Sequence, residues 1–172
     1  MYERMGEERM KIQVFHGGTE AIASPKADAG RPNLDFGQGF YVTNLRLQAL
    51  DWAKHVSDRR KKPAVLNTYT LDHDAVLNNY RCKVFTEYDG EWLDFIVESR
   101  LGNKPWADYD YIEGGIANDR VIDTINLCMA DLMTRDKALE KLSEHRPNNQ
   151  ICLINQEIID KHLTYDGTEY NL

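Results

Sequence analysis

The most informative stretch of the sequence is DFGQGFYVT, residues 35–43. Its two glycines allow a tight loop, because glycine adopts backbone conformations that other residues avoid. Residues 40–42 are aromatic or β-branched, a composition that favours a strand. Thr43 or Asn44 then suits the cap of a helix predicted over residues 45–56, whose apolar side chains recur at helical spacing. The stretch therefore predicts a glycine-rich loop, a short strand and a helix in direct succession.

Two further predicted strands carry a polar residue at one edge. The strand over residues 12–15 ends at His16, which is followed by two glycines. Two glycines directly after a strand indicate a tight turn or a place where the backbone must approach a ligand closely. Late in the chain, a strand predicted over residues 150–154 begins at Gln150. Considered alone, such a histidine is more often structural and such a glutamine more often an ordinary surface residue, so neither marks a site by itself.

The rest of the chain alternates irregularly between strand and helix patterns. Strands are predicted over residues 64–71, 81–85 and 109–116, helices over 92–100, 121–133 and 137–142, and a last helical turn over 157–162. Residues 21–32 are expected to be mostly loop, and the residues after 162 a polar tail. The chain shows no internal repeat and no low-complexity segment. From its length and this pattern we expect a single α+β domain over residues 11–172, preceded by an N-terminal extension, residues 1–10.

The composition excludes several classes of protein. The 172 residues are 42% hydrophobic and 28% charged, which suffices for a core without a metal or disulfides. The net charge of −7 argues against binding nucleic acid through bulk charge. No apolar run approaches the ~20 residues that span a bilayer, and no signal peptide is visible. The three cysteines lack zinc or dithiol spacing. We therefore expect a cytoplasmic protein without membrane contact or bound metal.

In their order along the chain, these segments resemble the bacterial DUF3990 family. That family has been grouped with the His–Tyr–Glu branch of ADP-ribosyltransferases, to which the diphtheria-toxin-like and poly(ADP-ribose)-polymerase-like enzymes belong. The matching segments are Val14–Gly18, Leu34–Thr43, Gln48–Ala53, Asp110–Asp119 and Asn149–Ile151. They extend over about residues 12–165, which is nearly the whole chain. The resemblance implies an ADP-ribosyltransferase-like domain, with a split, twisted β-sheet and flanking helices around a cleft for NAD.

The resemblance also implies a role for each site residue. His16, Tyr41 and Gln150 form the implied catalytic set. His16 would hydrogen-bond the adenosine-side ribose, and Gln150 would hydrogen-bond the nicotinamide-side ribose. Tyr41 would stack on the nicotinamide ring, with Trp52 as a second aromatic wall, although a tryptophan on an apolar helix face is by default a core residue. The backbone of Gly17 would pair with the nicotinamide carboxamide.

Further residues are implied as cofactor-binding because they belong to the same motif: Phe36, Gly39, Phe40 and Thr43. Arg31 is the candidate partner of the NAD pyrophosphate, because an acidic chain needs a local cation to meet a dianionic cofactor. The basic run over residues 59–62 is interpreted as a solvated helix end. The alternative for this run is a patch that binds the acceptor.

The implied activity is transfer of a single ADP-ribose unit from NAD to an unidentified macromolecular acceptor, a protein or a nucleic acid, with release of nicotinamide. The resemblance suggests a bacterial toxin that a small antitoxin protein neutralises. Gln150 departs from the transferases that carry glutamate at this position, and an amide can position a substrate but cannot accept a proton as a carboxylate does. Two alternatives follow: an NAD glycohydrolase that uses the same site, and a catalytically silent module that binds NAD or a protein.

Overall fold

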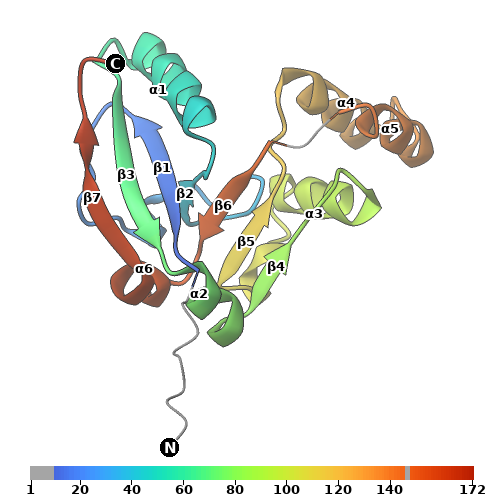
Figure 1. The fold of residues 1–172 in the computed structure, drawn as a ribbon. Coiled ribbons are helices and arrows are strands. Elements are labelled where there is room, and N and C mark those ends of the chain that lie inside the picture. Colours follow the sequence, from blue (N-terminus) through green and yellow to red (C-terminus); the bar gives the residue numbers. More distant parts are fainter. Residues whose placement is uncertain (1–9, 146–147) are drawn as a thin grey trace, which may run out of the picture.

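Two β-sheets form the centre of the molecule, and helices flank each of them (Figure 1). The computed structural model describes residues 10–145 and 148–172, so nearly all of the predicted extension, residues 1–10, lies outside the described residues. The strands are β1 (Ile12–Gly18), β2 (Phe40–Val42), β3 (Val65–Leu71), β4 (Cys82–Val84), β5 (Tyr111–Gly114), β6 (Gln150–Leu153) and β7 (Leu163–Glu169). The helices are α1 (Arg46–Arg60), α2 (His73–Asn79), α3 (Gly90–Arg100), α4 (Asp119–Met129), α5 (Arg135–Leu142) and α6 (Gln156–His162), with 3₁₀ turns at Ala27–Ala29 and Pro105–Asp108. This arrangement confirms the predicted α+β class.

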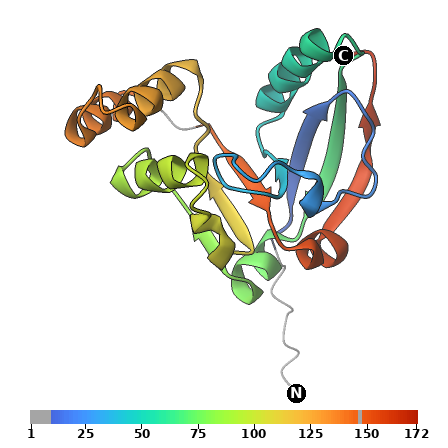
Figure 2. The ribbon, with the colours of Figure 1, turned by 180° about the vertical axis from the view of Figure 1, so that it is seen from behind.

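The first sheet consists of β1, β3 and β7 in that order, and all its pairs are antiparallel. Helix α1 lies along one face of this sheet (Figures 1 and 2). Phe15 on β1 points toward α1 and packs against Ala49. Gly17 points the same way, and a Cβ at this position would overlap the carbonyl oxygen of Ala49. Glycine at position 17 is therefore what allows α1 to pack so closely on β1.

The second sheet has the order β2-β6-β5-β4, with β4 parallel to β5 and the other pairs antiparallel. Helices α3, α4 and α5 gather on one side of it (Figure 2), around an aromatic core that includes Phe36 and Trp92. The other face carries Phe40 and Tyr111 and packs with Tyr69 of the first sheet. Among the described residues, no helix has both the length and the apolar character needed to cross a bilayer.

Within the described part of the chain, a single pair of residues joins β1 to the end of β2 through backbone hydrogen bonds. Phe15 and Thr43 exchange two backbone hydrogen bonds of 2.8 and 2.9 Å in antiparallel register. Continued pairing would place Gly17 opposite Tyr41. The ladder stops at the Phe15–Thr43 bridge instead, so the two strands separate at Gly17 and Tyr41. Gly17 and Tyr41, two of the predicted site residues, therefore lie where the two sheets split.

Three parts of the fold differ from the sequence prediction. The expected polar tail contains β7, which pairs with β3 over most of its length. Helix α2 occupies a segment without a predicted element, and it begins where the Asp72 carboxylate accepts a hydrogen bond from the N–H of Ala75. The helix predicted to reach residue 133 ends at Met129, because Asp131 adopts a left-handed backbone with φ of 56°.

Candidate active site

His16 is fixed by a hydrogen bond to the backbone of the neighbouring sheet. Its Nδ1 lies 2.7 Å from the carbonyl oxygen of Tyr41, and its ring stacks on Phe40 with centroids 4.7 Å apart. Burial is the main cause that lowers the pKa of His16, so the imidazole is neutral at pH 7. A carbonyl oxygen only accepts, so Nδ1 carries the proton and Nε2 is left as a bare acceptor. Nε2 of His16 is therefore a hydrogen-bond acceptor whose orientation is fixed by the bond from Nδ1 to Tyr41.

The hydroxyl of Tyr41 already makes two hydrogen bonds within the protein. The hydroxyl donates to the carbonyl of Gly37 at 2.6 Å and accepts from the N–H of Phe36 at 3.1 Å. Burial is the largest of the effects that raise the pKa of Tyr41, so the phenol stays protonated. Tyr41 is thus a packing and positioning group here and is unsuited to act as a base. It points to the opposite face of β2 from Phe40, on which His16 stacks.

Gln150 holds a buried polar atom that lacks a partner. Its side-chain Nε2 is sealed from solvent and makes no hydrogen bond within the described residues. Such a group costs about 1–3 kcal/mol, and its retention calls for an explanation such as a missing ligand. Gln150 and Cys152 point to the same face of β6, and Cys152 lies opposite Tyr41 in the register. Gln150 and Tyr41 therefore share one face of the second sheet.

The backbone N–H and C=O of Gly17 face the split between the two sheets. Phe15 directs its N–H and C=O away from β3, toward Thr43. Strand alternation then directs the N–H and C=O of Gly17 to the same edge. No turn or loop in the described ranges bonds to these two groups. We call this pair of groups the open edge of β1. It lies beside His16 and faces the strand that carries Tyr41.

Trp52 is exposed on α1, contrary to the default expectation of a core residue. Its side chain is 53% accessible and stacks on His55 with centroids 5.3 Å apart. One turn earlier on the same helix face, Gln48 makes a reciprocal pair with the backbone of Asn149, at 2.7 and 3.2 Å. Helix α1 therefore turns the face that bears Trp52 toward the start of β6, where Gln150 lies.

The other motif residues support the candidate site through packing and hydrogen bonds within the fold. Phe36 is fully buried and stacks on Phe85. A Cβ at Gly39 would lie 2.7 Å from the carbonyl oxygen of Leu153, so glycine allows β2 to start against β6. Thr43 donates its hydroxyl to the carbonyl oxygen of Asn149 at 2.7 Å, and the Thr43 hydroxyl oxygen accepts from the N–H of Leu45, which directly precedes α1. These contacts show how the motif shapes the fold, and they leave Phe36 no surface for a ligand.

Two arginines near the motif behave differently. Arg31 is exposed and makes no hydrogen bond or ion pair with any residue that the structure describes. Arg100, on α3, forms an ion pair with Asp35 at 2.7 Å, with both side chains largely buried. This pair anchors the glycine-rich loop to α3.

A polar network next to Gln150 has no counterpart in the sequence predictions. The side-chain amide of Asn149 donates to Asn44 at 2.8 Å and to Glu113 at 3.1 Å. The other oxygen of Glu113 accepts from the hydroxyl of Tyr111 at 2.7 Å and lies 3.4 Å from Nε2 of His73. Hydrogen bonding to Glu113 raises the pKa of His73, and the pKa of Glu113 is lowered by its bonds to His73, Tyr111 and Asn149 against the opposing effect of burial. The network fixes the residue that precedes Gln150.

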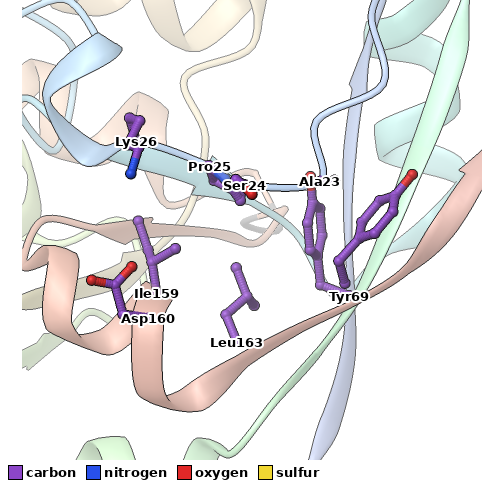
Figure 3. Close-up of a pocket in the computed structure, with 9 residues that line it drawn as sticks. Ala23, Ser24, Pro25, Lys26, Tyr69, Ile159, Asp160 and Leu163 are labelled. Carbon is purple, nitrogen blue, oxygen red and sulfur yellow. The ribbon is translucent and has the colours of Figure 1, made fainter.

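A separate pocket of about 280 Å³ lies on the far side of the first sheet from α1 (Figure 3). It is lined by the loop from Ala23 to Lys26 and by Tyr69, Asp160 and Leu163, among others. None of the residues predicted to bind NAD lines it. The structure thus brings His16, Gly17 and the backbone of Tyr41 to the split between the sheets, with the side chains of Tyr41 and Gln150 on the opposite face of the second sheet from His16. The pocket lies elsewhere.

Comparison with known proteins gives one match. Residues 12–165 match the family described as "Protein of unknown function (DUF3990)". No curated protein and no solved structure was found to match the chain.

Proposed function

The chain belongs to the DUF3990 family, and from that premise we propose that it is an NAD-dependent ADP-ribosyltransferase. In this proposal the two sheets are the split sheet of the ADP-ribosyltransferase fold, and NAD lies along the open edge of β1. The observation that carries the proposal is the combination of that open edge with the bare Nε2 acceptor of His16 beside it. A carboxamide and a ribose hydroxyl are the two groups of NAD that such a pair complements.

The open edge suits the nicotinamide carboxamide. This group has one carbonyl acceptor and an NH₂ donor, so it can pair with the C=O and N–H of one residue as a neighbouring strand would. Gly17 presents both groups on the side away from β3. The packing of α1 already requires the absence of a side chain there, as the Ala49 contact shows. The structure thus adds a packing reason for this glycine to the sequence interpretation.

His16 and Gln150 suit the two riboses. Nε2 of His16 accepts a hydrogen bond from a hydroxyl, and the Tyr41 carbonyl fixes its orientation. The buried amide of Gln150 donates to a hydroxyl oxygen, which satisfies its unpartnered Nε2. Trp52, exposed on the facing side of α1, supplies an aromatic surface for the nicotinamide ring.

The chemistry needs positioning more than proton transfer. The bond between nicotinamide N1 and ribose C1′ breaks, and nicotinamide leaves as a neutral molecule with the bonding electron pair. The acceptor forms a new bond to the oxocarbenium-like C1′ and releases its proton. Because Gln150 cannot take that proton, transfer of single units to an acceptor that needs little activation is the expected outcome.

The acceptor is a macromolecule in this proposal, and the biological setting is a bacterial toxin in the cytoplasm, held in check by a small antitoxin protein. Three free cysteines suit a reducing compartment. An NAD glycohydrolase is the second candidate. The missing carboxylate at position 150 favours it, because water competes best where no base selects the acceptor.

The test uses NAD labelled in its adenine ring, incubated with the purified protein in the presence and absence of bacterial lysate. The proposal expects nicotinamide release together with label on a macromolecule. Gln150→Ala should abolish both signals without lowering the melting temperature, because Nε2 has no protein partner to lose. Gln13→Ala, at an exposed glutamine of β1, is the matched control and should behave as wild type.

The outcomes separate the candidates. Nicotinamide without macromolecular label identifies the glycohydrolase. A melting temperature that rises with NAD, with no nicotinamide released under either condition, identifies a silent binding module. Activity that survives in Gln150→Ala removes this residue from the site.

A further inference from the structure

The diphosphate of NAD needs a cation that the site as described so far lacks. It carries two negative charges, and the chain carries a net charge of −7. A local positive group must therefore offset the repulsion between them. The sequence prediction assigned this role to Arg31, which is exposed and lies in the loop before the glycine-rich stretch. The structure places another arginine at the end of β1 that follows Gly17.

Arg60 is the last residue of α1, and it reaches back to the end of β1. Its Nη1 lies 3.4 Å from the hydroxyl oxygen of Thr19, which directly follows the last residue of β1. Its positive charge also contributes to lowering the pKa of His16, which places the guanidinium within electrostatic reach of the imidazole. Helix α1 packs on Gly17 through Ala49 and Ala53, and Arg60, about two turns further along the helix, contacts Thr19, two residues beyond Gly17.

The guanidinium of Arg60 is free to bind an anion. No acidic side chain pairs with it in the described part of the chain, whereas nearby Lys62 already faces Glu20 at 3.6 Å. Its hydrogen bond to Thr19 uses only one of the five N–H donors of an arginine. The planar fork of donors matches two phosphate oxygens, and the negative end of the α1 dipole holds the cation in place.

We propose that Arg60 binds the diphosphate of the dinucleotide that the open edge of β1 and His16 hold at its two ends. This inference rests on the proposed function. It assigns the basic end of α1 a role that the sequence left between a solvated helix end and an acceptor-binding patch. It also predicts that the site selects ligands with a diphosphate over nucleosides that lack one.

The experiment measures the affinity of the purified protein for NAD and for nicotinamide riboside, which has the nicotinamide and its ribose but no phosphate. Titration calorimetry or ligand-observed NMR gives both constants. Arg60→Ala should weaken NAD binding by roughly ten- to a hundredfold, the range for losing charged hydrogen bonds, and leave nicotinamide riboside unchanged. Arg60→Lys should fall between this variant and wild type, because it keeps the charge and loses the fork.

Two arginine variants serve as controls, and a melting curve confirms that each variant is folded. Arg59→Ala removes the exposed neighbour on the same turn and should leave both affinities near wild type. If Arg60→Ala binds NAD as Arg59→Ala does, or if Arg31→Ala causes the loss instead, the assignment of Arg60 is wrong. Equal weakening of NAD and nicotinamide riboside also overturns it. Wild-type protein that binds neither compound overturns the proposed function itself, a result distinct from any of these.

Discussion

Nδ1 of His16 and the carbonyl oxygen of Tyr41 lie 2.7 Å apart and connect the two sheets at the point where they part. The contact does two things at once. It decides which nitrogen of the imidazole carries the proton, and it joins β1 to β2 beyond the last backbone pair, Phe15–Thr43. The orientation of a site residue and the docking of the sheets therefore depend on the same hydrogen bond.

His16→Asn should separate these two functions. An asparagine amide can still donate to the Tyr41 carbonyl from near the Nδ1 position, but it has no atom in place of Nε2. We expect a folded protein that no longer binds NAD, measured by calorimetry. A variant that binds NAD as wild type does would show that Nε2 takes no part.

The same variant should change the response to acid. The pKa of His16 is lowered in the folded state, so the unfolded chain binds more protons below its ordinary value of 6.5. His16 therefore makes the free energy of unfolding fall as the pH falls below about 6.5. Denaturant titrations at several pH values should show a shallower acid loss in His16→Asn, and identical slopes would contradict the burial argument.

Gly17→Ala should destabilise the protein, whereas Gly18→Ala should not. A methyl group at position 17 would overlap the Ala49 carbonyl and lie 2.9 Å from the N–H nitrogen of Ala53, whereas at position 18 its nearest neighbour is the His16 ring at 3.8 Å. Overpacking of this kind costs about 1–3 kcal/mol. Denaturant unfolding of the two variants, compared side by side, measures the difference. Equal stabilities would mean that α1 can move away from β1 at little cost.

Trp52→Ala should affect ligand binding without affecting stability. The side chain is 53% exposed, so its loss should change the free energy of unfolding by less than about 1 kcal/mol. Leu47→Ala is the matched control, because Leu47 is 76% exposed on the same helix. Only the Trp52 variant should bind NAD more weakly in a titration. If both variants, or neither, bind more weakly, α1 does not present an aromatic wall to the ligand.

Glu113→Gln should alter stability in a pH-dependent way. The pKa of His73 is raised by Glu113, so this interaction stabilises the folded state fully below pH 6.5 and is lost as the pH rises through the folded pKa of His73. Both side chains are only 17% exposed, and breaking such a pair costs about 3 kcal/mol. The difference in unfolding free energy between wild type and variant should therefore be larger at pH 5.5 than at pH 8. A difference that grows with pH would contradict the pair.

The strands that carry the site were predictable because their apolar residues stand out locally. Strands β1, β2 and β6 and helix α1 each carry apolar side chains at strand or helix spacing, and glycines adjoin β1 and β2. By contrast, β7 alternates half-buried with exposed positions and contains Asp166 and Gly167, so its pairing with β3 is set by the backbone and leaves no apolar signature. Its position could only come from the tertiary fold.

The polar network around Glu113 could not be predicted from the sequence for a related reason. Glu113 lies inside a predicted strand, and nothing local distinguishes a strand carboxylate that meets His73 from one that meets water. Similarly, Gln48 and Asn149 become partners only when α1 and β6 meet. Trp52 shows the opposite error, since apolar spacing predicts a core position and the structure exposes the ring. The family resemblance, in contrast, named residues at the sheet junction that composition alone would have left aside.

The hydrogen bond between Thr43 and Asn149 has a consequence for the order in which the protein folds. These two residues are 106 positions apart, and their bond fastens the strand of Tyr41 to the strand of Gln150. Pairings over such long stretches of chain form slowly, because the intervening loop must close before any contact is gained. The site is therefore completed late in folding. If the chain is cut between β2 and β6 and the two pieces separate, neither piece contains the whole site.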